Sequence, residues 1–408
     1  MCKTNRDDAA EATRTATHNV HISDRKVKVF ASEVEESTLK QARELARMPF
    51  VWPHVALMPD AHTGLGSSVG TVFGTKRAVI PAAVGGDIGC GMIGVLTQFT
   101  KDDLQGKDLK DLRQAIEDNI PLSPGNYNSW QLRDSANDRC RELNALAEEL
   151  GVDLSHSPKW RQQLGSLGGG NHFIELCLDE QDRVWMFLHS GSRGVGNKIA
   201  KKHIKIAQRL CEQWWIPLPN KDLAYLVQGT PEFKAYLQDL KWAQRFAFLN
   251  REEMMDRFAD CLEEFMGQEL VELERINCHH NYTVKEKHFG HEVWLTRKGA
   301  VNAAEGRKAL IPGSMGTASY VVEGKGYPGG LMSAPHGAGR RFSRTEARRR
   351  FTVDDLAAGM EGIEYRPGEE FIDEIPDAYK DIDVVMRDAE PLVTVLHRLR
   401  QVMNVKGT

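Results

Sequence analysis

Apolar residues recur every three or four positions along several stretches of the chain, which is the spacing of a helix with one buried face. The clearest stretch runs from Thr230 to Met266, where Thr230 suits the N-cap and Pro231 suits the first helical position. We predict helices at 35–47, 103–119, 135–150, 230–266 and 388–402.

Apolar and polar residues alternate over shorter stretches, as they do in strands. This pattern predicts strands at 26–30, 293–296 and 319–322, and short strands with many breaks in the glycine-rich apolar stretch 48–96. The strands do not alternate regularly with helices, and we find neither an internal repeat nor a Pro/Ser-rich linker. The pattern therefore predicts one large α+β domain over 25–408, preceded by a polar, flexible N-terminal arm at 1–24.

The composition is that of a folded globular protein, because 41% of the 408 residues are apolar and 27% are charged. A net charge of −4 excludes a uniformly basic chain, so a site for a polyanion must be a local patch. The longest apolar stretch, 78–96, is interrupted by Asp87, and the first 24 residues lack the apolar core of a signal peptide. Seven scattered cysteines form no disulfide framework, so we expect a reduced, cytoplasmic protein without membrane contact.

Glycines gather in clusters that also hold His, Cys, Asp, Asn, Arg or Ser residues. Such loops let backbone N–H groups approach an anion closely, although a single cluster is usually only a turn. So many clusters with reactive residues favour a binding site, but none of them is a Walker A or Rossmann motif. The clusters are 64–66, 85–91, 165–172, 189–194, 312–317 and 336–340.

Asp87 and Cys90 are the first candidate metal ligands. They stand three residues apart in a glycine-rich turn, which can aim both side chains at one point. A carboxylate in an otherwise apolar stretch is costly unless it is paired or bound to a metal. The alternative is that Asp87 caps a turn and Cys90 fills the core.

A predicted β-hairpin brings two histidines together. Apolar strands flank the acidic turn 179–182, and if Leu178 pairs with Arg183, His172 lies opposite His189. Opposed residues have Cβ atoms about 5 Å apart, which lets two imidazoles bind one metal ion or two adjacent ions. The alternative is that the two rings only close the hairpin.

One residue of the pair His279 and His280 is a further candidate ligand, while the other orients it or touches a substrate. The alternative is a solvated or capping pair. The candidates are too many for one closed tetrahedral site, which fits two metal ions bridged by the Cys90 thiolate. Thiolate and imidazole by themselves suit zinc, and the residues alone do not fix the metal.

His336 stands apart from these candidates, between Pro335 and Gly337. An arginine-rich run follows it at 340–350, and such a run is usually a solvated helix face. Arginines beside a histidine flanked by glycines can instead hold phosphates or an RNA backbone. A histidine without a metal can act as a general acid or base, or as a covalent nucleophile toward phosphorus.

The order of these motifs along the chain resembles that of the RtcB family of RNA ligases. The resemblance covers most of the chain, from about residue 30 to the C-terminus. The motifs that carry it are MPDAH at 58–62, GDIGCGM at 86–92, GNHF at 170–173, HSGSRG at 189–194, NCHHNY at 277–282, PGSMG at 312–316, HGAGR at 336–340 and VKG at 405–407.

The resemblance implies the family's own α+β fold, with the active site in a central cleft, two Mn²⁺ ions and GTP as co-substrate. It implies that Cys90 bridges the two ions, that Asp87 and His172 complete one site, and that His189 and His280 complete the other. His336 matches the histidine that becomes covalently guanylylated, and Asp60 matches a carboxylate at the edge of the nucleotide pocket. The residues that match positions near the guanylate or the metals are Asn171, Glu175, Arg193, Ser314, Met315, Gly316, Gly337, Gly339, Tyr379 and Lys406.

The implied reaction joins RNA ends that bear a 2′,3′-cyclic phosphate or a 3′-phosphate to ends that bear a 5′-hydroxyl, in RNA repair or in tRNA splicing. It passes through a histidine–GMP adduct and an RNA 3′-pp-G intermediate. The alternative functions are a metal-dependent cyclic phosphodiesterase that does not join ends and a non-catalytic RNA-binding protein. The intact set of metal ligands argues against the second of these.

The chain departs from the family pattern at Pro335, where a small residue such as Ser is expected, at Thr408 after the usual terminal Lys-Gly, and in its longer N-terminal arm. None of these departures removes a residue that carries chemistry. The physiological RNA, the oligomeric state and any accessory activating or RNA-repair protein are not identified by the sequence.

Overall fold

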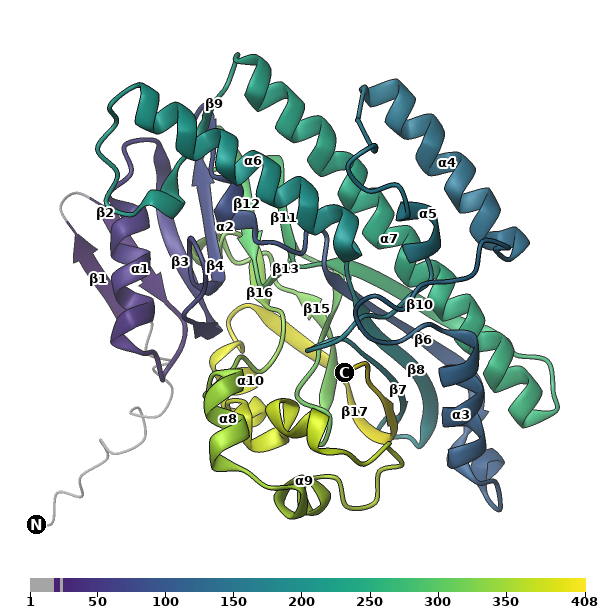
Figure 1. Cartoon of the computed structure of the whole chain (residues 1–408). Coiled ribbons are helices and arrows are strands. Elements are labelled where there is room, and N and C mark those ends of the chain that lie inside the picture. The colour runs from purple at the N-terminus through teal and green to yellow at the C-terminus, as the bar shows by residue number, and fades with distance from the viewer. Residues whose placement is uncertain (1–17, 23–24) are drawn as a thin grey trace, which may run out of the picture.

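Two β-sheets form the centre of the molecule in the computed structural model, which describes residues 18–22 and 25–408 (Figure 1). The first sheet has the strand order β1-β2-β3-β4-β12-β11, with β2 and β3 parallel and the other neighbours antiparallel. Its strands are β1 (His18–Ile22), β2 (Arg25–Val29), β3 (Val51–His62), β4 (Val69–Thr75), β11 (Asn281–His288) and β12 (His291–Lys298).

The second sheet is antiparallel throughout and has the strand order β10-β6-β8-β7-β17-β15-β14. Its strands are β6 (Gly91–Thr100), β7 (Phe173–Leu178), β8 (Arg183–Ser190), β10 (Glu272–His279), β14 (Lys308–Ile311), β15 (Ser319–Gly324) and β17 (Val393–Val405). Two short pairs accompany the sheets: β5 (Ala78–Val79) with β9 (Leu226–Val227), and β13 (Ala300–Asn302) with β16 (Ser333–Pro335).

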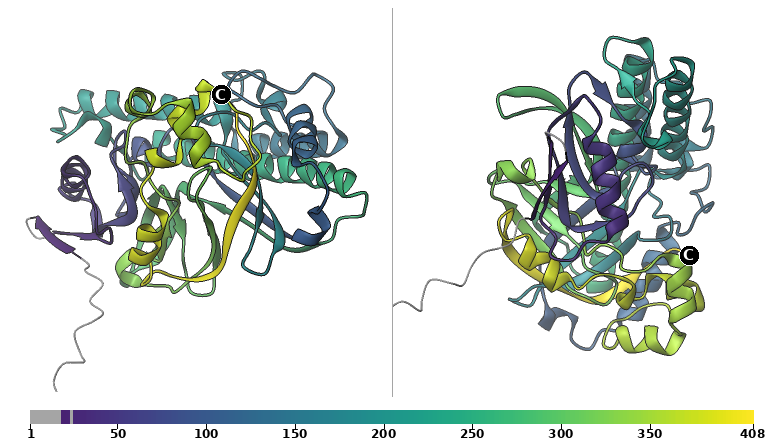
Figure 2. Two further views of the ribbon diagram at one scale, coloured as in Figure 1. Left: turned by 90° about the horizontal axis from the view of Figure 1, so that it is seen from below. Right: turned by 90° about the vertical axis from the view of Figure 1, so that its left-hand side faces the viewer.

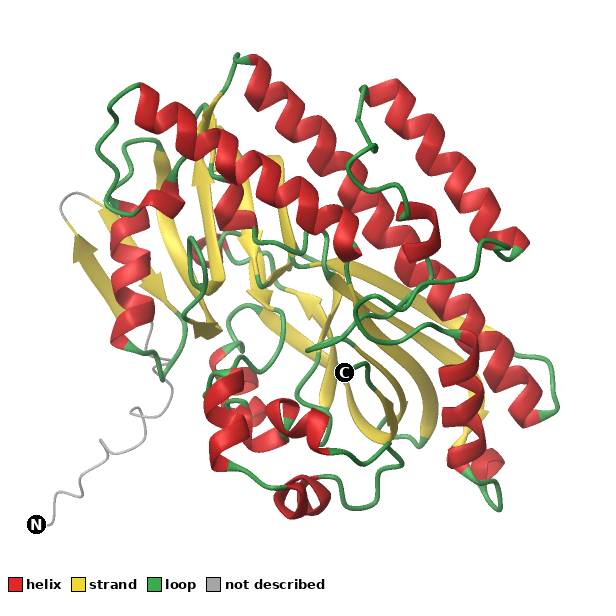
Figure 3. Ribbon diagram, in the orientation of Figure 1, coloured by secondary structure: helices red, strands yellow, loops and turns green. Residues whose placement is uncertain are grey.

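Helices cover the outer sides of the strands, and Figure 3 shows the long ones crossing above both sheets. The α-helices are α1 (Glu36–Ala46), α2 (Pro81–Val84), α3 (Leu109–Asn119), α4 (Asp134–Leu150), α5 (Trp160–Gln163), α6 (Arg193–Gln213), α7 (Pro231–Met266), α8 (Arg344–Arg350), α9 (Val353–Gly359) and α10 (Ile382–Asp388). Short 3-10 helices are η1 (Lys101–Leu104), η2 (Lys221–Leu223), η3 (Pro328–Gly330), η4 (Glu369–Glu374) and η5 (Pro376–Ala378).

The core is divided by the second sheet, because successive side chains of a strand point to opposite faces. On β6, Met92 belongs to the apolar cluster shared with the first sheet, whereas Ile93 belongs to the cluster shared with α3 and α7. A further apolar cluster joins α4, α6 and α7. In the two views of Figure 2, these long helices form a layer of their own beside the strands. The second sheet thus separates two parts of the core, one shared with the first sheet and one shared with α3 and α7.

Most of the predicted elements are present, and the α+β class with a single domain is confirmed. The predicted helix at 230–266 is α7, with the Thr230 side chain accepting a hydrogen bond from the Phe233 N–H and with Pro231 as its first residue. Of the predicted N-terminal arm, residues 18–22 form β1, and the rest lies outside the described residues. The predicted strands at 48–96 are longer than expected, since β3 has 12 residues and β6 has 10.

Two helix predictions were wrong in part. The stretch 388–402 is mostly strand β17, which pairs with β15 on one side and β7 on the other, so sheet pairing outweighs helix propensity there. The stretch 103–119 is divided into η1 and α3, because Gly106 takes a positive φ of 76° between them. No helix among the described residues is long and apolar enough to cross a membrane.

Candidate metal centre and nucleotide pocket

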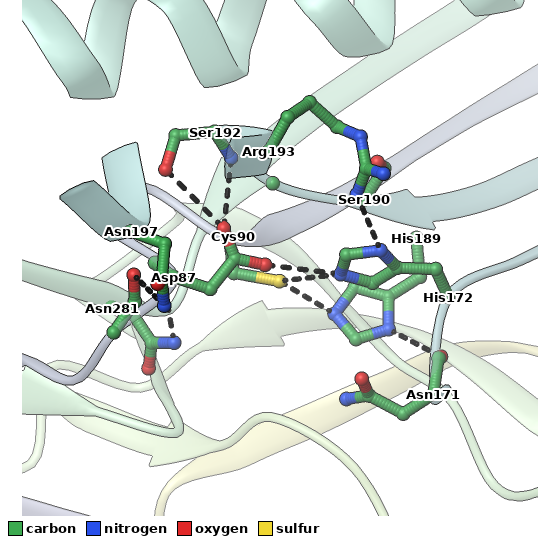
Figure 4. Close-up of polar contacts among 12 residues, drawn as sticks. Asp87, Cys90, Asn171, His172, His189, Ser190, Ser192, Arg193, Asn197 and Asn281 are labelled. Atoms are coloured by element: carbon green, nitrogen blue, oxygen red, sulfur yellow. Dashed lines mark hydrogen bonds and ion pairs between the residues drawn. The ribbon is translucent and has the colours of Figure 1, made fainter. Parts of the chain in front are cut away.

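Asp87 and Cys90 lie in the loop that connects α2 to β6. One Asp87 oxygen, Oδ1, accepts hydrogen bonds from the Ser192 backbone N–H at 2.9 Å and the Ser192 hydroxyl at 3.2 Å (Figure 4). Gly191 leaves room for this carboxylate, since a Cβ atom there would lie 2.3 Å from both of its oxygens. The loop therefore fixes the carboxylate beside the Cys90 thiol, as the Asp-x-x-Cys spacing predicts.

The hairpin of β7 and β8 supplies the first two histidines, but its register is not the predicted one. Phe173, not His172, pairs with His189, and Leu178 pairs with Val184. Because Asp179 pairs with Arg183, the turn is the three residues 180–182, in which Asp182 takes a positive φ of 57°. The rings of His172 and His189 still meet, with centroids 5.3 Å apart, because His172 precedes the strand and leans over its end.

Both of these imidazoles have their Nδ1 atoms committed to backbone carbonyls. His172 Nδ1 lies 2.9 Å from the Leu167 oxygen, and His189 Nδ1 lies 3.0 Å from the Asn171 oxygen. A carbonyl only accepts, so each Nδ1 carries the proton and each Nε2 carries a lone pair. Those Nε2 atoms lie 3.5 and 3.2 Å from Cys90 Sγ, as Figure 4 shows. This arrangement is typical of histidines that bind metal ions.

His280 completes the cluster, and its neighbour His279 does not take part. Adjacent residues at the end of β10 point in opposite directions, and His279 Nδ1 lies 2.8 Å from the Gly89 oxygen, away from the thiol. His280 donates from Nδ1 to Asn281 Oδ1 at 3.2 Å, and its Nε2 lies 2.9 Å from Nε2 of His189. The residues alone left open which of the two histidines is the candidate ligand, and the structure places His280 in the cluster.

The predicted ligands form two groups that share Cys90: Asp87, Cys90 and His172 in one, and Cys90, His189 and His280 in the other. Within each group the ligand atoms lie within 4.8 Å of one another. The two facing Nε2 atoms of His189 and His280 both carry lone pairs, which repel at 2.9 Å unless a cation lies between them. Thiolate, imidazole and carboxylate are ligands of divalent transition metals, so these residues fit a metal pair.

Burial keeps the second group in its metal-binding form. Burial, and then the positive charge of neighbouring histidines, holds the pKa of His189 and His280 well below the usual value for histidine. Both rings are therefore neutral at pH 7, and only a neutral imidazole can bind a metal ion.

His336 follows β16 and lies beside the metal cluster, with its ring centroid 4.5 Å from that of His280. Its Nδ1 lies 2.6 Å from Oδ2 of Asp60, a fully buried residue of β3. The same oxygen accepts the backbone N–H groups of His336 at 3.1 Å and Gly337 at 3.3 Å. Asp60 therefore fixes the ring with a proton on Nδ1 and leaves the Nε2 lone pair free for chemistry.

Two small features keep His336 in place. Gly339 takes a positive φ of 75°, and a Cβ atom there would lie 2.2 Å from the Asp60 carbonyl oxygen. Pro335 is the last residue of β16 and pairs with Ala300. This departure from the family pattern therefore falls on the last residue of a strand.

A cavity of about 320 Å³ opens in front of the metal cluster and His336. Its wall includes Asp87, Cys90, His189, His280 and His336. Of the residues predicted to lie near a guanylate, those in its wall are Asn171, Ser314, Met315, Gly337, Gly339, Tyr379 and Lys406. Glu175, Arg193 and Gly316 lie behind it: Arg193 opens α6 and donates to Ser166 Oγ at 3.3 Å, and Gly316 packs against Gly359.

Glu175 is buried behind Lys406, where β7 meets β17. It accepts a hydrogen bond from Asn404 Nδ2 at 2.7 Å. Burial raises the pKa of this carboxyl to about 8, although the Asn404 hydrogen bond and the Lys406 charge oppose the shift. The side chain is thus a protonated carboxyl at neutral pH.

Glu374, which the sequence analysis did not identify, lies in the wall of the cavity among positive charges. Tyr379 donates to its Oε2 at 2.5 Å, Arg340 and Arg344 lie 3.2 and 2.8 Å from Oε1, and Lys406 lies 3.5 Å from Oε2. Burial raises its pKa, but the charges of Lys406, Arg344 and Arg340 outweigh burial and lower it. No motif marks this residue in the acidic segment of η4.

Lys298 and His62 are two further wall residues that the sequence analysis did not single out as ligands. The Lys298 ammonium donates to the Ser67 carbonyl at 2.7 Å, and burial lowers its pKa to about 7. Burial lowers the pKa of His62 to about 4. The cavity thus combines a cluster of candidate metal ligands, one histidine held by a carboxylate, and a cationic wall, which together suit a phosphate-bearing ligand.

Comparison with known proteins agrees with this geometry. The sequence model of the family described as tRNA-splicing ligase RtcB matches residues 41–407. The RNA-splicing ligase RtcB of Escherichia coli (strain K12) is 45% identical over 392 residues, which covers 92% of this chain and 95% of that protein. The tRNA-splicing ligase RtcB of Thermococcus kodakarensis is 31% identical over 444 residues, which covers 91% of this chain and 92% of that protein. The chain therefore belongs to the RtcB family, whose name is that of an RNA ligase.

Proposed function

We propose that this protein is a GTP- and Mn²⁺-dependent RNA ligase, which joins 3′-phosphate or 2′,3′-cyclic phosphate ends to 5′-hydroxyl ends. One observation carries the proposal: His336 has Nδ1 bound to Asp60, 2.6 Å away, and lies in the same cavity wall as four of the five predicted ligands, Asp87, Cys90, His189 and His280. A phosphodiesterase needs the ligand groups but not this histidine. Because one cavity presents both His336 and predicted metal ligands, the arrangement favours the ligase over the phosphodiesterase.

The first covalent step follows from the protonation of His336. The Nε2 lone pair attacks the α-phosphorus of GTP, a P–N bond forms, and the bond from that phosphorus to the bridging oxygen breaks as pyrophosphate leaves. The imidazole becomes positively charged, and the Asp60 carboxylate stabilises that charge through Nδ1–H. Asp60 therefore stabilises the positively charged adduct more than it stabilises the free, neutral His336.

The RNA 3′-phosphate then takes the guanylyl group. One of its oxygens attacks the phosphorus of the adduct, and the P–N bond breaks. RNA 3′-pp-G then leaves, and His336 is restored as a free imidazole. In the last step the 5′-hydroxyl oxygen attacks the 3′-phosphate phosphorus, loses its proton, and displaces GMP. A cyclic phosphate end first gains water and loses its bond to the 2′ oxygen, which gives the 3′-phosphate.

Asp87, Cys90, His172, His189 and His280 would hold the two Mn²⁺ ions. Bound there, the ions supply a Lewis acid for the phosphoryl oxygens. The wall residues do the remaining work. Arg340, Arg344 and Lys406 place positive charge on one side of the cavity, and Asn171 and Ser314 offer hydrogen-bonding groups to a nucleotide.

Labelling with GTP tests the proposal. We expect the protein to take up label from α-labelled GTP and Mn²⁺, and acid to remove it, because a phosphoramidate is acid-labile. His336→Ala should lose the label and the sealing of 3′-phosphate ends, yet still seal an RNA that already carries a 3′-pp-G end. His291→Ala, which replaces an exposed histidine outside this cavity, is the control and should keep the label. Label uptake by His336→Ala would assign the nucleophile to another residue.

Opening of a 2′,3′-cyclic phosphate by the parent protein, with neither label nor joining, would support the phosphodiesterase instead. The same assay thus separates the two functions. It leaves the physiological RNA and any accessory protein to be found by experiments in cells.

A further inference from the structure

Arg251, in the middle of α7, is a fully buried guanidinium that lies behind the metal cluster, on the side away from the cavity. It donates to the Asn277 side-chain oxygen at 2.8 Å, to the Gly89 carbonyl at 2.9 Å and to the Ser190 carbonyl at 3.1 Å. Its Nη2 also lies 3.1 Å from His279 Nδ1. These partners are all neutral, so no carboxylate among them offsets the cost of burying the charge.

Three of the four partners of Arg251 adjoin a predicted metal ligand in the chain, and the fourth, Asn277, lies three residues before His280. Gly89 precedes Cys90, Ser190 follows His189, and His279 precedes His280. His279 Nδ1 also lies 2.8 Å from the Gly89 oxygen. The His279 ring, the Gly89 carbonyl and the Arg251 guanidinium therefore meet at one point, whichever ring nitrogen of His279 carries the proton. A single side chain thus ties together three segments that are far apart in the sequence, two through backbone carbonyls and the third through the side chains of Asn277 and His279.

The preceding residue, Asn250, extends this arrangement to the fourth segment. Its Oδ1 accepts from the Gly165 N–H at 2.7 Å, and its Nδ2 lies 3.2 Å from the Gly191 oxygen and 3.3 Å from Ser190 Oγ. Ser190 Oγ in turn donates to the Leu167 carbonyl, which also accepts from His172. The pair Asn250 and Arg251 therefore contacts every segment that carries an imidazole ligand.

We propose that Arg251 is a positioning residue of the dinuclear metal centre, which holds Cys90, His189 and His280 at the separation that two ions require. The proposal rests on the metal centre of the proposed function. Arginine suits this task because its planar fork donates in several fixed directions, whereas a lysine ammonium at the same place is a point charge on a flexible stem. Burial lowers the pKa of Arg251 to about 10, so the guanidinium stays charged at neutral pH.

The test compares two substitutions in the full-length chain, Arg251→Lys and Arg257→Lys. Arg257 is the matched control, because it is also buried in α7 and also donates to several groups, among them Glu253, Asn128 and the Asn119 carbonyl. None of these partners adjoins a predicted ligand. Titration calorimetry with Mn²⁺ alone, without GTP or RNA, gives the affinity and the number of ions bound.

We expect Arg251→Lys to bind Mn²⁺ about 10- to 100-fold more weakly than the parent, which is the usual effect of losing a group that supports metal ligands. The electron paramagnetic resonance signal of a coupled ion pair should weaken in parallel. Arg257→Lys should lower the thermal unfolding midpoint as much as Arg251→Lys does, yet keep the parent affinity. Circular dichroism confirms that each variant is folded before titration.

Parent affinity in folded Arg251→Lys would overturn the proposal, as would an equal loss in Arg257→Lys. If Arg251→Lys does not fold, His279→Ala removes one contact of the guanidinium and should weaken Mn²⁺ binding, and unchanged binding there would overturn the proposal too. A parent chain that binds no Mn²⁺ would overturn the metal centre itself, and this proposal with it. If the parent and both variants bind Mn²⁺ normally, only the role of Arg251 is refuted, and the metal centre is not.

Discussion

His172, His189, His280 and His336 each donate from Nδ1 to an oxygen, and the nature of the oxygen that accepts from Nδ1 separates their roles. His172 and His189 donate to backbone carbonyls, and His280 donates to an amide oxygen. These neutral acceptors favour neutral rings that act as metal ligands. His336 donates to a carboxylate instead, which favours a ring that gains positive charge during the reaction.

Cys90 belongs to both ligand groups, so its removal should affect two ions at once. We expect Cys90→Ala to bind no Mn²⁺ and to lose RNA joining while it keeps its fold. Elemental analysis of the purified variant measures the metal content. Cys278→Ala, which replaces a buried cysteine of β10 outside both groups, should keep two ions per chain. Two ions bound to Cys90→Ala would contradict the bridging role.

Asp60 should control the rate of the first covalent step. Asp60→Asn removes the negative charge but keeps an acceptor for Nδ1–H, so the adduct loses its electrostatic partner. We expect the rate of label uptake from GTP to fall by about 10²- to 10⁴-fold, the range for groups that assist proton and charge balance. Mn²⁺ affinity should stay unchanged, because Asp60 belongs to neither ligand group. A parent rate of labelling in Asp60→Asn would exclude this role.

At the scale of elements, β17 connects the C-terminus to the site. It lies between β7 and β15, and its pairing with β7 places Asn404 opposite Glu175. Lys406, just beyond the strand, reaches the cavity wall and lies 3.5 Å from Glu374. The strand therefore brings a buried carboxyl and the last cation of the chain to one side of the nucleotide pocket.

The pairing of β7 with β17 should depend on pH through Glu175. Its pKa is about 8 in the folded chain against an ordinary value of 4.5, so the folded chain holds a proton that the unfolded chain releases between these values. The contribution of Glu175 to the free energy of unfolding is therefore largest below about pH 4.5, and it falls as the pH rises to about 8. Glu175→Gln should remove this loss, which is on the order of a few kcal/mol.

Urea unfolding of the metal-free chain at pH 5, 6.5 and 8 measures this effect, with those values chosen to span roughly the titration window. The stability of the parent relative to Glu175→Gln should decrease across the series. Glu361→Gln, at an exposed position, should follow the parent at every pH. An equal pH dependence in the parent and in Glu175→Gln would contradict the raised pKa.

The elements that the sequence predicted wrongly are those whose conformation depends on distant residues. The stretch 388–402 becomes a strand because β7 and β15 pair with both of its sides, and no local pattern records that. The hairpin register shifts by one residue because Asp182 adopts a positive φ, which Asp tolerates but does not signal. Helix α7, by contrast, was predicted to the residue, because its cap and its periodicity are local.

At the scale of the molecule, the ligands come from the loop before β6, from both arms of the β7–β8 hairpin and from the end of β10, three parts of the chain that only the fold brings together. Cys90 precedes β6, the β7–β8 hairpin carries His172 and His189, and His280 follows β10. Motif spacing pointed to the candidate ligands, which the fold brings together, because each segment has its own glycines and reactive residues. It missed Glu374 and Arg251, because a single Glu or Arg within a helical segment has no local sign of what it contacts.

Because the ligand segments belong to different parts of the chain, metal binding should stabilise the whole fold. A ligand that binds only the folded chain adds RT ln(1 + [L]/Kd), which is about 2.7 kcal/mol when the free ion is at 100 times its Kd. We expect the thermal unfolding midpoint to rise steadily with Mn²⁺ concentration in the parent. Cys90→Ala should show no rise, since both ligand groups lose their shared atom.

Magnesium at the same concentrations is the control for a nonspecific ionic effect. Mg²⁺ prefers oxygen ligands in octahedral geometry, so a site built from a thiol, three imidazoles and only one carboxylate should bind it weakly and leave the midpoint unchanged. Equal shifts with the two ions, or an equal rise in Cys90→Ala, would show that Mn²⁺ acts elsewhere on the molecule. A rise confined to the parent and to manganese would tie global stability to the one sulfur atom that both ligand groups share.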